Sequence, residues 1–128
     1  AADAATTKNL DIISDWPTAK FLLFNLDSYA KLRARGVKVR LITEKPSASD
    51  KKHKELSKQC SELFEIRYLG RAVPMKAAVY DGKVANLRVR THQDNDMIPS
   101  LWSDNAAFVQ VIMAYYEKLW EQAQSDTR

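Results

Sequence analysis

Apolar and polar residues alternate with the two-residue period of a β-strand in several short stretches of the chain. The clearest is VKVRLIT, where Val37, Val39 and Leu41 are separated by basic residues. Further along, two strand-like runs flank an Asp-Gly pair, a dipeptide typical of tight hairpin turns. The stretches predicted as strands are residues 8–14, 37–43, 63–70, 74–80 and 83–90.

Longer segments show the spacing of three to four residues that is typical of amphipathic helices. The first begins after Asp15, a predicted N-cap, and ends at Gly36, which suits the left-handed conformation that follows many helices. The last covers residues 101–124, with Ser103 as its predicted N-cap. A more polar helix is expected within residues 45–63.

The resulting order is strand, helix, strand, helix, three strands and a closing helix. Early alternation of strands and helices favours parallel pairing with right-handed crossovers, whereas the hairpin adds antiparallel pairing. We therefore predict an α/β fold with a mixed, mostly parallel sheet flanked by helices. The length of 128 residues suits a single domain over residues 1–128.

Composition narrows the class of protein further. Hydrophobic residues make up 45% and charged residues 28% of the chain, as in folded soluble domains, and no apolar run is long enough to span a membrane. The chain has one cysteine, Cys60, which cannot form an internal disulfide and indicates a reducing compartment. We expect a cytoplasmic protein without a membrane partner.

Most common catalytic and metal-binding motifs are missing from the sequence. It contains no glycine-rich phosphate loop and no serine in a nucleophile elbow. One cysteine and two histidines are too few for a metal site with the usual spacing, so neither a metal nor another cofactor is expected. The net charge of +4 permits an anionic partner, but the basic residues are spread along the chain.

Pro74, Lys76 and Asp81 fall on the spacing of the phospholipase D signature, in which a His is followed after one residue by Lys and after four more by Asp. The strand and turn around them also resemble that superfamily. The resemblance implies that the His is the nucleophile, that the Lys supports the phosphate and that the Asp orients the site. Proline offers no nucleophile at position 74, so the chain is expected not to be an enzyme.

A wider resemblance covers residues 10–124. The segments RGVKVRLITEKP, FEIRYLG, PMKAAVYDGK and LWSDNAAFVQVIMAYYEKLWEQA follow the order found in archaeal TrmB-like transcriptional regulators. In these a winged-helix DNA-binding domain precedes a phospholipase-D-like domain. The resemblance implies a sensor or effector domain that reaches DNA only through a domain outside this chain. Alternatives are the sensor module of an archaeal signalling kinase, a single-motif phosphodiesterase, and a dimerisation module without a ligand.

A ligand site is predicted around Lys76. Because Ala77 and Val79 should face the core, Lys76 should face away from it, where Arg67, Arg88 or Arg90 could join it in a shallow groove. Such a groove would bind a sugar or an anion weakly, and His92 is a further candidate contact. The alternative is that these cations all point separately into solvent.

Self-association is also expected. Apolar residues cover more than half of the circumference of the closing helix, which is wider than one core-facing stripe requires. A second copy of the chain would cover the surplus, so we predict a homodimer.

Overall fold

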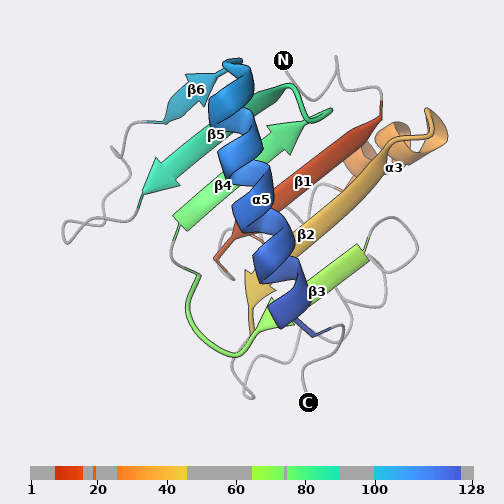
Figure 1. The fold of residues 1–128 in the computed structure, drawn as a ribbon. Coiled ribbons are helices and arrows are strands. Elements are labelled where there is room, and N and C mark those ends of the chain that lie inside the picture. Colours follow the sequence, from red (N-terminus) through yellow and green to blue (C-terminus); the bar gives the residue numbers. More distant parts are fainter. Residues whose placement is uncertain are drawn as a thin grey trace.

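The computed structural model describes residues 8–15, 19, 26–45, 65–73, 75–89 and 100–124, which build one sheet with a helix on each face. Figure 1 shows α5 lying diagonally across the strands, with α3 behind them. The elements are β1 (Asn9–Ser14), α3 (Leu26–Ala34), β2 (Lys38–Glu44), β3 (Glu65–Leu69), β4 (Met75–Tyr80), β5 (Val84–Val89), β6 (Leu101–Ser103) and α5 (Ala106–Gln122).

The sheet has six strands in the order β3-β2-β1-β4-β5-β6. β1, β2 and β3 are parallel, whereas β4, β5 and β6 continue the sheet with antiparallel pairs. This confirms the predicted mixed α/β sheet, but the expectation that it is mostly parallel was wrong, because two strand pairs are parallel and three are antiparallel. The helix expected within residues 45–63 lies outside the described residues.

Each face of the sheet packs its own hydrophobic core. On one face, Leu10 of β1 and Val39 of β2 pack with Tyr29 and Leu32 of α3. Alternate residues of the same strands turn to the other face and pack under α5, as Ile13 does. Because the sheet is covered on both sides, polar side chains within its central strands, such as Asp11 and Arg40, need partners inside the protein.

The two turns predicted from glycine positions are confirmed. Asp81 and Gly82 have φ values of 58° and 66°, the left-handed pair that a tight hairpin between β4 and β5 requires. Gly36 has a φ of 82°, and the N–H of Val37 donates to the carbonyl of Leu32 at 3.0 Å. That bond closes α3 in the manner of a Schellman motif.

The start of the closing helix was predicted incorrectly. Leu101–Ser103 form strand β6, and the helix begins at Ala106 with Asn105 as its N-cap. The Asn105 side chain accepts the N–H of Phe108 at 3.1 Å, whereas the Ser103 hydroxyl accepts the N–H of Asn105 itself. Pairing of residues 101–103 with β5 overrode the helical pattern.

Candidate functional site

Lys76 and Arg88 are direct cross-strand neighbours, one on β4 and the other on β5. The residues beside Lys76 in the strand alternate with it: Ala77 and Val79 are buried under α5. Lys76 therefore points to the opposite face, the one that carries α3. The structure thus brings together two of the cations proposed from the sequence.

Lys76 is held by a carboxylate that the sequence did not identify as its partner. Its ammonium nitrogen lies 3.3 Å from the Oδ2 of Asp15, whose side chain is only 8% exposed. Asp15 directly follows the carboxyl end of β1, and its carbonyl accepts the N–H of Ala19, as expected of an N-cap residue. The pair compensates a charge that would be costly to bury alone.

Other polar groups lie at the same end of the parallel strands. Ser14 is buried and its hydroxyl donates to the carbonyl of Asp15 at 3.2 Å. Thr43 of β2 stands directly opposite Ser14, is fully buried, and its hydroxyl has no hydrogen-bond partner among the described residues. Open α/β sheets generally bind ligands beyond the carboxyl ends of their strands, so this is a plausible place for a site.

Arg88 is fixed on the outer side of this cluster. Its Nε donates to the Ser100 hydroxyl at 2.9 Å, and the residue is exposed. The guanidinium keeps further N–H donors that could contact a ligand. The cluster of Ser14, Asp15, Thr43, Lys76 and Arg88 is called the Lys76 cluster below.

Arg67 does not join Lys76, contrary to the groove expected from the sequence. It lies on the opposite face of the sheet, where its Nη1 donates to the carbonyl of Trp120 at 2.8 Å. Its guanidinium also lies 4.3 Å from the centre of the Trp120 ring. Since β3 is separated from β4 by two strands, the two side chains could not meet even on a shared face. Arg90, His92 and Pro74 lie outside the described residues.

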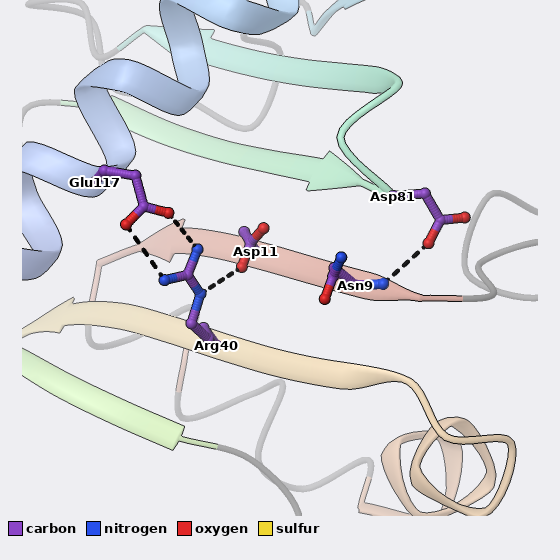
Figure 2. A network of polar contacts seen from close by, with 5 residues as sticks. All are labelled: Asn9, Asp11, Arg40, Asp81 and Glu117. Carbon is purple, nitrogen blue, oxygen red and sulfur yellow. Dashed lines mark hydrogen bonds and ion pairs between the residues drawn. The ribbon is translucent and has the colours of Figure 1, made fainter.

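Asp81, the acidic residue of the phospholipase-D-like spacing, has a structural role at the end of β4 opposite Lys76. Its Oδ1 accepts the backbone N–H groups of Lys8 at 2.7 Å and Asn9 at 3.0 Å. Figure 2 shows the contact between Asp81 and Asn9 at the start of β1. Five residues of extended chain separate Asp81 from Lys76, or about 16 Å. Asp81 therefore orders the strand and does not contact the Lys76 cluster.

A second polar network, not foreseen from the sequence, lies under α5 (Figure 2). Arg40 of β2 bonds through Nε to Asp11 of β1 at 2.8 Å and through Nη2 to Glu117 of α5 at 2.6 Å. Its guanidinium lies 4.9 Å from the centre of the Tyr116 ring and 5.0 Å from that of Trp120. Arg40 thus ties two strands to the helix.

Burial governs the electrostatics of this network. Burial raises the pKa of Asp11, although the hydrogen bond and the charge of Arg40 act in the opposite direction. For Arg40, burial lowers the pKa, but the hydrogen bonds to Glu117 and Asp11 outweigh it and raise the pKa overall. The sequence held one signal for this network, an aspartate within the apolar run of β1. Because its guanidinium is already bonded to Asp11 and Glu117, Arg40 is suited to joining β1, β2 and α5.

No group of His, Cys, Asp and Glu that could hold a metal ion occurs among the described residues. None of the helices in the described part is both long and apolar enough to span a lipid bilayer.

Comparison with known proteins places the chain by its fold. No family model matches it, and no curated protein matches it in sequence. Among solved structures it is similar to TrmBL2, an archaeal chromatin protein with a novel mode of DNA binding, with a TM-score of 0.74 and 17% identity. The match covers 98% of this chain and 48% of TrmBL2, so the chain spans about half the length of that relative.

The chain is also similar to Nuc from Salmonella typhimurium, a member of the phospholipase D family. Here the TM-score is 0.69 and the identity 10%, with 99% of this chain and 87% of Nuc covered. These likenesses confirm the resemblance drawn from the sequence, at the level of architecture. The chain therefore has a phospholipase-D-like α/β fold, which it shares with a TrmB-like protein.

Proposed function

We propose that the chain is a non-catalytic sensor or effector domain of a cytoplasmic, TrmB-type transcription regulator. The fold shared with TrmBL2 over nearly the whole chain supports this role. Sequence-specific recognition of DNA would belong to a domain outside the chain. The effector would be a small anion or polyol, bound at the Lys76 cluster, and a homodimer would transmit the signal.

The observation that carries the proposal is the pairing of Lys76 with Asp15. A buried carboxylate 3.3 Å from the Lys76 ammonium offsets the positive charge that a reacting phosphoryl group would need, but it leaves N–H donors of the ammonium for weaker contacts with a ligand. The pair offers donors and acceptors side by side, with Arg88 next to Lys76 as a second cation. Such a set suits weak binding of a polar ligand, since a charge-assisted hydrogen bond contributes roughly 1.5–3 kcal/mol before ordering costs are subtracted.

The rival function is a phosphodiesterase with a single motif. It is disfavoured because position 74 holds proline, and removing the nucleophile eliminates the covalent pathway itself. We expect no turnover of a bis-aryl phosphodiester by the purified chain. Turnover that disappears in Lys76→Ala would establish the enzyme instead.

Ligand binding is tested by thermal unfolding with phosphate, sulfate and sugar phosphates. We expect at least one of them to raise the melting temperature of the native chain and to raise that of Arg88→Ala less. Lys76→Ala leaves Asp15 buried without its partner, so Lys76→Ala/Asp15→Asn is the better second variant.

Arg71→Ala is the matched control, because Arg71 is an exposed arginine that bonds Gln122 of α5, whereas the Lys76 cluster lies on the face that carries α3. Equal shifts in the native chain and in all variants would refute the site. A dimer that responds to none of the ligands would instead favour the dimerisation module. The full-length gene product distinguishes the regulator from the kinase sensor, since either a winged helix or a kinase domain should accompany this domain.

A further inference from the structure

The end of the sheet opposite the Lys76 cluster carries positive charge from three separate segments of the chain. β1 and β2 begin there, the turn between β4 and β5 lies there, and α3 ends there (Figure 1). The cations at this end are Lys8, Lys31, Arg33, Arg35, Lys38 and Lys83, all exposed. We call this set the basic rim.

Backbone hydrogen bonds fix the segments of the rim beside one another. The N–H of Lys38 donates to the carbonyl of Lys8 at 2.9 Å, which joins the starts of β2 and β1. The N–H of Asp81 donates to the carbonyl of Asn9 at 2.8 Å, which joins the hairpin turn to β1. Lys83 follows two residues later in that turn, so the rim is a fixed feature of the sheet.

Little negative charge balances the rim among the described residues. Asp11 and Glu117 are occupied by Arg40, and Asp15 by Lys76. Among the described residues, three carboxylates stand at this end of the sheet: Asp81, which accepts two backbone N–H groups, Glu65 at the start of β3, and Asp104 directly after β6. Lys8, Lys38 and Lys83 form no ion pair with any residue that the structure describes. The positive charge of these three lysines, which is not paired among the described residues, thus lies at the end of the sheet remote from the predicted ligand site.

We propose that the basic rim binds the phosphate backbone of double-stranded DNA without reading its bases. Adjacent strands are about 4.8 Å apart, so Lys38 at the start of β2, Lys8 before β1 and Lys83 in the turn after β4 come from neighbouring segments along one end of the sheet, where they would meet successive phosphates. Single-stranded nucleic acids are usually bound through several aromatic side chains on which successive bases stack, whereas the described residues beside the rim expose one such ring, that of Trp102, and it already stacks on Tyr80.

This contact goes beyond the proposed effector function, does not involve the Lys76 cluster, and departs from the expectation that the domain reaches DNA only through a domain outside this chain. Phosphate contacts position a protein on DNA, whereas contacts with base edges specify the sequence. The rim would therefore add affinity and orientation to a base-reading domain located elsewhere.

The test is the binding of the purified chain to a labelled duplex of arbitrary sequence, followed by fluorescence anisotropy at several salt concentrations. Each lysine that contacts a phosphate contributes about 1 to the slope of log affinity against log salt. We expect Lys8→Gln/Lys38→Gln/Lys83→Gln to weaken binding and to reduce the magnitude of that slope by about 3.

The control variant Lys45→Gln/Arg71→Gln/Lys118→Gln removes the same charge away from the rim and should bind nearly as well as the native chain. Equal weakening in both variants would show an effect of net charge only and would overturn the proposal. So would stronger binding to a single strand, or binding only to vesicles of anionic lipid. Unchanged melting temperatures confirm that each variant remains folded.

Discussion

Arg40 is the residue on which the packing of α5 most depends. Its side chain occupies a position between buried neighbours in β2, yet it is charged and only 24% exposed. Asp11 and Glu117 satisfy the guanidinium, and two aromatic rings cover its faces. Removing one member of a buried ion pair is much more costly than replacing the whole pair, because it leaves a buried charge uncompensated.

We predict that Arg40→Met lowers the free energy of unfolding by about 3 kcal/mol at neutral pH. Burial already raises the pKa of Asp11 in the folded chain, and loss of Arg40 removes the two influences that lower it. The folded state of the variant then binds the Asp11 proton more tightly than the unfolded state does. Its stability should therefore recover as the pH falls toward and through the raised pKa of Asp11.

Chemical denaturation of both chains between neutral and mildly acidic pH measures this. The double variant Asp11→Asn/Arg40→Met, which has no carboxyl group at position 11, should lose most of the acid-dependent recovery. A stability deficit of Arg40→Met that stays constant over the whole pH range would contradict the role given to Asp11.

In the Lys76 cluster, too, the placement of a charged side chain depends on a partner that is distant in the sequence. The period of two along β4 was enough to place Lys76 away from the core. It could not identify Asp15 as the partner, since α3, β2 and β3 lie between that residue and Lys76 in the sequence. The same two-residue period along β3 did not determine which face of the sheet Arg67 occupies. Its contact with Trp120 places it on the face that carries α5.

At the scale of elements, α5 depends on a defined start. The first four N–H groups of a helix have no partner within it, and here the Asn105 side chain accepts the N–H of Phe108. β6 ends two residues earlier, so this cap sets the boundary between strand and helix.

We predict that Asn105→Ala lowers the free energy of unfolding by about 1 kcal/mol, whereas Asn105→Gly costs only a few tenths. Ser103→Ala should cost less than Asn105→Ala, because the Ser103 hydroxyl bonds only the N–H of Asn105, outside the helix. Urea denaturation of the three variants measures the order. A larger loss in Ser103→Ala would reassign the cap.

At the scale of the whole molecule, the two edge strands of the sheet differ in how far they are covered. The outer edge of β3 is joined to Gln124, which exchanges two backbone hydrogen bonds with Tyr68. At the other edge, β6 exposes Leu101 and Trp102, and the nearby helix exposes Val111. Much of the broad apolar arc of α5 packs within the chain, so the surface left for a partner is smaller than the helix alone suggested.

We predict that the chain dimerises and that the exposed apolar residues contribute to the interface. Leu101→Lys/Val111→Lys should shift the population toward monomer in light scattering, because burying two ammonium groups in an interface is unfavourable. Ala114→Lys/Ala107→Lys adds the same charge at exposed helix positions of small side chains and should shift it less. A native chain that remains monomeric at high concentration would refute the dimer.

The sequence alone determined the features that depend on near neighbours. Strand periods, the hairpin at Asp81 and Gly82, and the end of α3 at Gly36 follow from local conformational preferences, which act over a few residues. The alternation of elements also fixed the α/β class and the mixed sheet.

Only the tertiary structure decided which distant side chains meet. Arg40 reaches Asp11 because β2 pairs with β1 in one register, and Lys76 reaches Asp15 because β4 lies on the other side of β1. Arg67 is excluded from that cluster for the same reason, since its strand lies beyond β2 and its side chain faces α5. Strand order and register result from the packing of the whole chain, so no local pattern could specify these partners.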